Sequence, residues 1–209
     1  SSSSAASDVY KRQSVDNVFM RNSDDCIAVY GHRWNFYGDT KDIKVFNSTL
    51  WADIAHPINI GGHGDPDSMT GELLEDITFK NIDILEHDED GILYQGCMTI
   101  SCTDKNRVRN VLFEDIRVEH IQEGRLFNLQ VCFNPKYNKQ PGNSIEDVTF
   151  RNITYYGSRE NPSLLEGLNE THRVQNIIFE NIVIRGKKVS SLQEMNVKMN
   201  NFVDKVIVR

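Results

Sequence analysis

Glu75-Asp76-Ile77-Thr78-Phe79-Lys80-Asn81-Ile82 is one copy of a phrase that repeats along the chain. Apolar Ile77 and Phe79 alternate with polar Thr78 and Lys80, and this period of two is typical of a β-strand. Related phrases occur at Val15–Asn22, Asp42–Asn47, Arg109–Ile116, Glu146–Ile153, Gln175–Ile182 and Asp204–Val208. The spacings are 25, 34, 34, 37, 29 and 29 residues, measured between Asn17, Asp42, Asp76, Asn110, Asp147, Asn176 and Lys205.

A second short strand is predicted within each repeat, such as Ile58–Ile60 or Met98–Ile100. The Asn and Asp residues before and after the strands suit turns, because their short side chains bond nearby backbone. Strands and turns repeating at a variable period predict a coil in which each rung pairs with the next. We therefore expect an all-β protein, a right-handed parallel β-helix, with residues 14–209 as a single domain. A β-sandwich would explain the alternation but not the repeated phrase, and leucine-rich repeats are shorter and richer in Leu.

Composition narrows the range of partners. The net charge is -7, whereas nucleic-acid binding needs a basic face. No apolar run approaches the roughly 18–20 residues of a membrane span. The four cysteines lack a C-x-x-C pattern, so we expect mostly buried thiols. We expect no metal or other cofactor, and a monomer.

The first residues look foreign to this pattern. Asp8–Gln13 reads back as GAT-GTG-TAT-AAG-AGA-CAG, which resembles the transposase end sequence used in sequencing libraries. Our hypothesis is that residues 1–13 are translated adapter and that the native sequence begins near Ser14. The domain would then be the C-terminal part of a longer protein. Different codons in the encoding DNA would contradict this.

An adjacent carboxylate pair, Asp24 and Asp25, stands just before an alternating strand. If Ile27 and Val29 of this strand align with Ile58 and Ile60 of the next rung, Asp25 lies beside His56, about 5 Å away. Two carboxylates and a histidine form an acid/base constellation. The backbone should bend so that both carboxylates face outward, and their proximity should raise the pKa of one. The alternative is a solvated turn.

These segments resemble a known family. Asn22–Val29 resembles the D-D-C-[IV]-A-[IV] motif of polygalacturonases, glycoside hydrolase family 28. Ala55–Gly61 resembles their G-H-G-I-S-I-G motif, with Ala55 and Pro57 in place of the first two glycines. Asn47–Trp51 is also similar to the related dextranase family 49. The resemblance implies a pectin-lyase-like solenoid and a carbohydrate substrate, a plant or microbial polysaccharide, and it favours a secreted or periplasmic location.

The resemblance also implies an inverting hydrolase. Asp24 would protonate the leaving glycosidic oxygen, Asp25 would hold or activate the water, and His56 would orient the acid. Inversion needs about 6.5–9.5 Å between acid and base carboxylates, to seat the water.

Two departures from the family's pattern affect the function. The family's further catalytic Asp, in an N-T-D motif, would fall within residues 1–13, where Asp8 lacks the motif and is not assigned. A fragment without that carboxylate should be inactive or nearly so. The family's R-I-K motif aligns with Thr99 and Ser101, which leaves Thr99 as the substrate contact. Because those cations bind the uronate carboxylate, their loss favours a neutral or differently charged glycan.

Four further residues are candidates for sugar contact. His63 and Asp65 follow the second motif at the expected groove rim, and Trp34 and Tyr37 could stack on pyranose rings. A plain glycine-rich loop and ordinary packing are the alternatives. His87–Asp90 is either a solvated acidic turn or a contact to sugar or a cation. Two other functions stay open: a lyase with a calcium cluster and a basic residue, and a non-catalytic glycan-binding adhesin.

Overall fold

The described chain winds through two sheets that are parallel apart from one antiparallel strand, which confirms the predicted parallel β-helix. The computed structural model describes residues 11–92, 94–158 and 161–209, and it contains no helix within them. The nine-stranded sheet contains β1 (Lys11–Asp16), β2 (Phe19–Asn22), β6 (Thr40–Ala52), β8 (Leu73–Asp88), β10 (Arg107–Glu123), β12 (Ser144–Tyr155), β14 (Val174–Ile184), β15 (Lys187–Val189) and β17 (Val203–Val208). The six-stranded sheet contains β3 (Ile27–Val29), β7 (Ile58–Ile60), β9 (Met98–Cys102), β11 (Phe127–Val131), β13 (Ser163–Glu166) and β16 (Val197–Met199).

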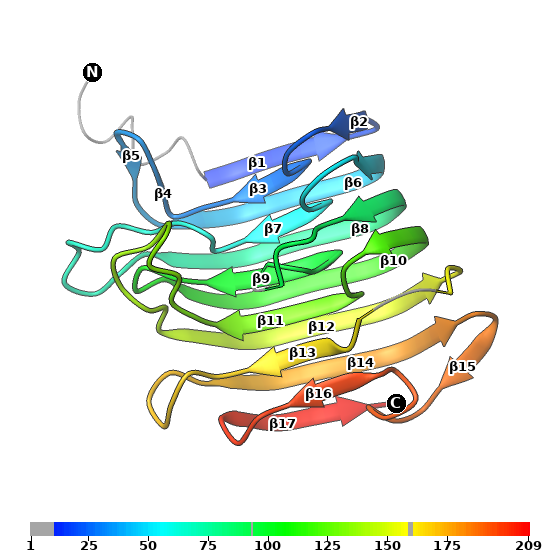
Figure 1. Cartoon of the computed structure of the whole chain (residues 1–209). Helices are drawn as coiled ribbons and strands as arrows, with labels where there is room; N and C mark the ends of the chain where they lie inside the picture. The colour runs from blue at the N-terminus through cyan, green and yellow to red at the C-terminus, as the bar shows by residue number, and fades with distance from the viewer. Residues whose placement is uncertain (1–10, 93, 159–160) are drawn as a thin grey trace.

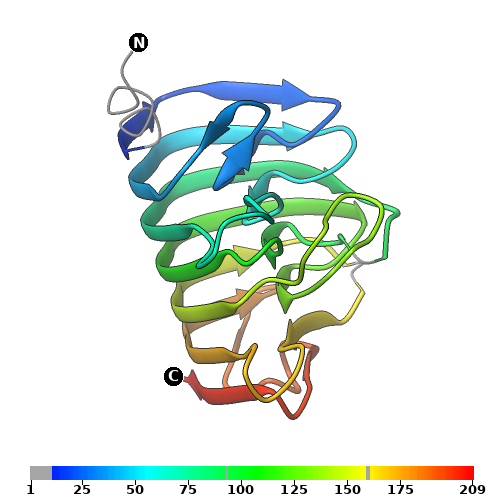
Figure 2. The same ribbon diagram turned by 90° about the vertical axis from the view of Figure 1, so that its left-hand side faces the viewer.

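The coil is right-handed. In Figure 1 the long strands β6, β8, β10 and β12 run to the right at the back, and β7, β9 and β11 run to the left in front. Followed from the N-terminal end, the chain therefore turns clockwise as it moves away. Figure 2 shows the rungs stacked in sequence order from the blue first rung to the red last one. A small hairpin of β4 (His32–Arg33) and β5 (Phe36–Tyr37) projects from this stack.

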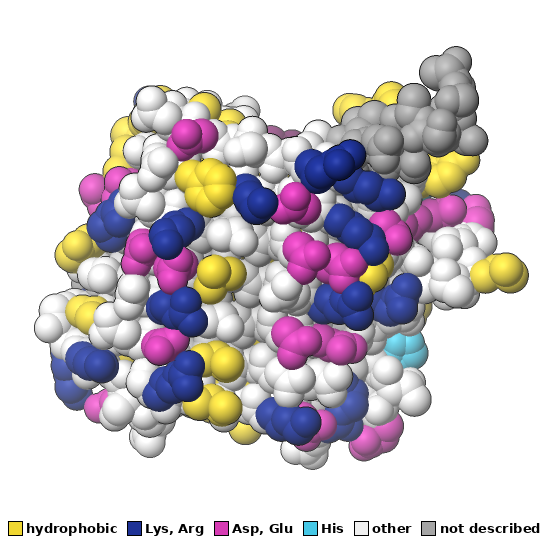
Figure 3. All heavy atoms as spheres, turned by 180° about the vertical axis from the view of Figure 1, so that it is seen from behind, with side chains coloured by type: hydrophobic (Ala, Val, Ile, Leu, Met, Phe, Trp, Pro, Cys, Tyr) yellow, Lys and Arg dark blue, Asp and Glu magenta, His cyan; other side chains and the backbone are white. Residues whose placement is uncertain are grey.

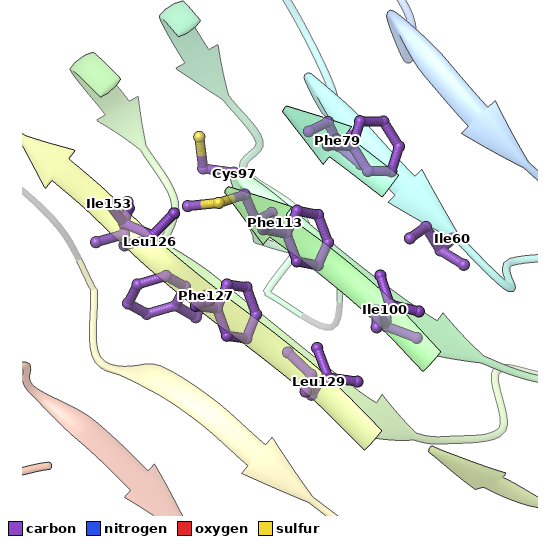
Figure 4. Close-up of a cluster of buried hydrophobic side chains, with 14 of the residues drawn as sticks. Ile60, Phe79, Cys97, Ile100, Phe113, Leu126, Phe127, Leu129 and Ile153 are labelled. Carbon is purple, nitrogen blue, oxygen red and sulfur yellow. The ribbon is translucent and has the colours of Figure 1, made fainter. Parts of the chain in front are cut away.

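The repeated phrase forms the core because each copy pairs in register with the next. Phe79 pairs with Phe113, which in turn pairs with Phe150, and Phe150 pairs with Phe179. The four rings are fully buried and stack nearly parallel, with centroids 5.4, 4.8 and 5.1 Å apart. Side chains of the opposite sheet complete this interior, as Figure 4 shows for Ile60, Ile100, Phe127 and Leu129. The alternation in the sequence thus records which residues face inward.

Most of the Asn and Asp residues around the phrases do not end the strands, contrary to the sequence prediction; an exception is Asn17, which lies between β1 and β2. Asp76 and Asn81, for example, lie inside the continuous strand β8 with φ of 58° and 55°. Asn and Asp tolerate this left-handed conformation better than most residues, so they bend the strand without breaking its pairing. Their side chains also bond from rung to rung: Asn152 donates to Asp115 and accepts from Asn181, both at 2.8 Å.

Rows of opposite charges cover the outer face of the nine-stranded sheet. Figure 3 shows Lys and Arg alternating with Asp and Glu down this face. In one row, Glu75 lies between Lys41 and Arg109 at 2.6 and 2.5 Å. In another, Arg151 lies between Glu114 and Glu180 at 3.0 and 2.8 Å. Parallel pairing sets opposite charges side by side, which avoids like-charge repulsion between rungs.

The remaining predictions about the chain concern its ends and cysteines. Residues 1–10 lie outside the described residues. Lys11–Gln13, also assigned to the adapter, form the first half of β1 and pair with β6, so the origin of residues 1–13 stays a hypothesis. All four cysteines are free thiols, and Cys97 and Cys102 are fully buried while Cys26 and Cys132 are half-buried. Within the described ranges, no helix is long and apolar enough to cross a membrane.

Candidate active site

The pairing of β3 with β7 brings Asp25 to His56. Ile27 pairs with Ile58 and Val29 with Ile60, which is the predicted register. The chain bends at Ser23 and Asp24 before β3 begins. Both carboxylates therefore line one pocket, of about 290 Å³, on the outer face of β3 and β7.

Asp25 is held on all sides. Its Oδ1 accepts hydrogen bonds from His56 Nδ1 at 2.7 Å and from the His56 backbone N–H at 3.2 Å. Its Oδ2 accepts from Asn59 Nδ2 at 2.8 Å and from the Tyr30 hydroxyl at 3.0 Å. An ionised carboxylate accepts about four hydrogen bonds. Asp25 therefore has no acceptor site left for a water, which disagrees with the water-holding role that the resemblance implied.

These bonds also fix the charge of Asp25. Burial alone would raise the pKa of this carboxyl, but the hydrogen bond and charge of His56, with Asn59 and Tyr30, lower it overall. The expected rise in pKa within the carboxylate pair therefore does not fall on Asp25. Tyr30 keeps its proton, since burial and the charge of Asp25 both raise its pKa.

His56 is the positive partner of this ion pair. It is almost fully buried, and both of its ring nitrogens face acceptors: Nδ1 faces Asp25 and Nε2 faces the Tyr94 carbonyl. A histidine satisfies two acceptors only when both nitrogens carry protons. Although burial lowers the pKa of His56, the bond to Asp25 and that to the Tyr94 carbonyl raise it overall. The ring thus orients Asp25, where the resemblance implied that it orients the acid.

A second histidine lies behind the first. His87 is fully buried, and its ring stacks on that of His56 with centroids 6.0 Å apart. Its Nδ1 donates to the Ala55 carbonyl at 3.0 Å, and its Nε2 accepts from the Gly96 N–H at 3.2 Å. These bonds require the neutral ring. Burial and then the neighbouring His56 lower its pKa to about 3.

Asp24 is the accessible carboxylate of the pair. Its side chain is exposed, and Oδ1 accepts the Asp25 backbone N–H at 2.8 Å. Glu89 supplies a third carboxylate to the pocket. It is half-buried, burial raises its pKa, and its Oε1 accepts the Gly91 N–H at 2.6 Å. The acidic run His87–Asp90 is thus not a solvated turn throughout: His87 is buried behind the site and Glu89 faces into it.

Arg33 and His63 form the side of the pocket nearest the hairpin. The His63 ring meets the Tyr30 ring edge-on at 4.9 Å. Burial and then the charge of Arg33 lower its pKa. Arg33 is exposed, and its guanidinium lies over the Trp34 ring, 5.2 Å from the centroid. A cation therefore stands beside the carboxylates, although it comes from the hairpin and not from the aligned R-I-K positions.

The other predicted sugar contacts lie outside this pocket. Trp34 is 77% exposed and lines a neighbouring pocket with Arg33 and His63. Tyr37 is exposed on the hairpin and meets His32 edge-on at 5.8 Å. Asp65 caps its own loop by accepting the Asp67 N–H at 2.9 Å. Thr99 is fully buried and bonded to Asn128 at 2.9 Å, so its predicted contact with substrate does not agree with the structure.

Comparison with protein families gave a match over most of the chain. The model of glycosyl hydrolases family 28 matches residues 6–201. The chain belongs to glycosyl hydrolases family 28. It is therefore a glycoside hydrolase of the polygalacturonase type, and its substrate is a carbohydrate. Comparison with curated proteins gave no match, nor did comparison with solved structures.

Four polar or aromatic residues of the pocket were missed from the sequence: Tyr30, Arg33, Asn59 and Tyr137. Asn59 carried a usable signal, because it is the polar residue of an apolar–polar–apolar strand and therefore faces outward. Tyr137 carried none, since it reaches the pocket from a loop whose course the repeat does not predict. Among the described residues, no cluster of three or more His, Cys, Asp or Glu side chains is arranged to hold a metal ion.

Proposed function

We propose that the chain belongs to an inverting glycoside hydrolase in which Asp24 is the general acid. The observation that carries this proposal is the contrast between the two carboxylates: Asp25 is saturated and ionised, whereas Asp24 is exposed in the same pocket. Asp24 is thus the carboxyl group of the pair that the leaving glycosidic oxygen can reach.

Asp25 acts in this proposal through its charge. The transition state of glycoside hydrolysis resembles an oxocarbenium ion, and a fixed carboxylate stabilises the positive charge that develops on the sugar. Since Asp25 has no free acceptor site, we propose that a carboxylate outside the described residues activates the water. The described residues alone would then be nearly inactive.

The substrate in this proposal is a plant or microbial glycan other than plain polygalacturonate. The aligned positions of the uronate-binding cations are Thr99 and Ser101, both uncharged and fully buried. Arg33 is the cation that lines the pocket instead. A secreted or periplasmic location goes with this class of substrate.

A glycan panel tests the proposal. The complete gene product is incubated with acidic and neutral polysaccharides, and new reducing ends and the anomeric form of the first product are measured. We expect hydrolysis with inversion, and Asp24→Asn should lower the rate by about 10²–10⁴-fold. Asp53→Asn, which removes an exposed carboxylate paired with Arg21, is the matched control and should retain full activity.

Three outcomes would contradict it. Full activity of Asp24→Asn would reject Asp24 as the acid. Calcium-dependent cleavage to an unsaturated product that absorbs in the ultraviolet would indicate a lyase. Glycan binding without new reducing ends would indicate an adhesin.

A further inference from the structure

Two loops meet at the pocket, one from the start of a strand of the six-stranded sheet and one from the end of the neighbouring strand. Tyr94 precedes β9, and Tyr137 follows β11. Their rings are in edge-to-face contact, with centroids 5.7 Å apart and planes at 69°. Both residues line the pocket that holds Asp24 and Asp25. We call this ring contact the tyrosine bridge.

Beneath the tyrosine bridge the sheet face is sealed. Thr99 on β9 and Asn128 on β11 point outward, yet both are fully buried and hydrogen-bonded to each other. A side chain at Gly96 would come within 2.8 Å of both residues. The loop that carries Tyr94 therefore lies directly on the sheet. No room remains there for a sugar ring.

The loop that carries Tyr137 is anchored by its neighbour Asn138. This side chain is buried, and its Nδ2 lies within hydrogen-bond distance of the Gly62 carbonyl, Thr103 Oγ1 and Asp104 Oδ2, at 3.1, 3.0 and 2.8 Å. Asp104 in turn accepts the backbone N–H groups of Lys139 and Gln140. These buried contacts hold the loop against Gly62, Thr103 and Asp104.

The loop that carries Tyr94 is anchored as firmly. The Tyr94 carbonyl accepts from His56, and the next residue, Gln95, is buried. Gln95 Oε1 accepts from Arg125 at 3.0 Å and from Asn161 at 2.9 Å. Both sides of the tyrosine bridge are thus fixed, and the bridge is a wall of the site.

We propose that this enzyme acts on the end of a glycan chain, which stops against the tyrosine bridge. A chain crossing β9 would have to separate the two rings and lift two anchored loops. The pocket of about 290 Å³ is at the small end of the range for ligand sites, which suits a terminal sugar. Tyrosine rings also offer apolar faces on which that sugar can pack. The inference rests on the proposed function in taking the bound molecule to be a glycan.

Binding of oligosaccharides of increasing length tests the inference, and it does not require turnover. The probes are an acidic series, galacturonic acid oligomers of two to eight units, and a neutral series, isomalto-oligosaccharides of the same lengths. Titration calorimetry gives the affinity for each oligomer and the number of protein chains bound per oligomer molecule. For the series that binds, we expect affinity to change by less than about twofold beyond three units. We also expect about one protein chain to bind each oligomer molecule.

Tyr137→Ala should open the wall. Tyr137 is half exposed, so its removal should not prevent folding, which circular dichroism verifies. In this variant we expect affinity to keep rising, by about tenfold between three and eight units. Tyr156→Ala, at a tyrosine that is 59% exposed and follows β12, is the matched control and should behave as the unaltered protein.

The outcomes separate the inference from the proposed function. Affinity that keeps rising with oligomer length in the unaltered protein would overturn chain-end action and leave glycan binding intact. Binding of several protein chains to one oligomer molecule would do the same. Binding that appears only after Tyr137→Ala would also overturn it, because the tyrosine bridge would then exclude sugar altogether. Absence of binding to both series in every variant would overturn chain-end action on these glycans, while hydrolysis in the glycan panel would still decide the proposed function.

Discussion

At the scale of single residues, the site depends on a buried ion pair between His56 and Asp25. Both side chains are at most 10% exposed, and their atoms lie 2.7 Å apart. Removing one partner of a buried pair leaves an uncompensated charge, and that cost exceeds the net value of the pair. Tyr30 and Asn59 share the negative charge but do not neutralise it.

His56→Ala should therefore lower the free energy of unfolding by about 3–5 kcal/mol. His120 offers a matched control, since it meets Glu86 at the same 2.7 Å but is 54% exposed. His120→Ala should cost at most about 1 kcal/mol. Urea unfolding of both variants measures the difference, and equal losses would show that burial of the His56 pair has no effect.

His87 should make the fold sensitive to acid. Its folded-state pKa is about 3, against 6.5 for a free histidine, so the unfolded chain binds the extra proton. Its contribution to stability is complete above pH 6.5 and is lost progressively as pH falls toward 3. His87→Gln retains a donor and an acceptor without titrating. Below pH 6.5, the free energy of unfolding of this variant should fall less steeply with pH, by up to about 1.4 kcal/mol per pH unit. Urea unfolding at several pH values measures this slope. An unchanged slope would contradict the neutral His87 assignment.

The pairing of Asp25 with His56 could be predicted because the inward residues of two motif strands fix the register, and the register fixes the polar neighbours. The saturation of Asp25 could not be predicted, since Tyr30 reaches it from beyond the end of β3. The prediction that Thr99 contacts the substrate was wrong for a related reason. Its outward direction was right, but the loop that covers it belongs to no repeat.

At the scale of the element, the long strands owe their shape to residues in the left-handed region. The sequence predicted turns at Asn and Asp, and the structure has bends within continuous strands. The sequence analysis was right that the chain changes direction at Asn and Asp. The error came from assuming that such a residue ends the ladder, whereas parallel neighbours that bend at the same position keep their pairing.

Substitutions at Asn152 separate backbone strain from the side-chain ladder. Its φ is 54°, a conformation that costs residues with a Cβ about 1–2 kcal/mol. Asn152→Ala should lower the free energy of unfolding by about that amount or more. Asn152→Gly should avoid the backbone strain, so its only loss of unfolding free energy should come from the missing hydrogen bonds to Asp115 and Asn181. Thermal or urea unfolding compares the two, and a glycine variant less stable than the alanine variant would refute the strain argument.

At the scale of the whole molecule, each rung is stabilised mainly by the rungs on either side. Phe113 has a stacked ring above and below it, whereas Phe79 and Phe179 each have one stacked neighbour along the row. Stability in such a stack is approximately a sum of rung and interface terms. The fold was predictable from the sequence for the same reason, because every rung repeats the same alternation of apolar and polar residues.

Phe113→Ala should lower the free energy of unfolding by about 3–5 kcal/mol, the range for buried Phe. In hydrogen exchange, it should increase exchange most in β8, β10 and β12, which flank the new cavity. Protection of β17, three rungs away from β10, should change least. Equal loss of protection in all strands would mean that the molecule unfolds as one unit.

The tyrosine bridge has a consequence for turnover. A groove that is open at both ends lets one product leave while the next stretch of polymer slides in. A pocket closed by anchored loops has a single mouth, so the released sugar must leave by the way the next chain end enters. Product and substrate then compete for one passage, and the enzyme should slow as short sugars accumulate around it, well before the polymer is used up.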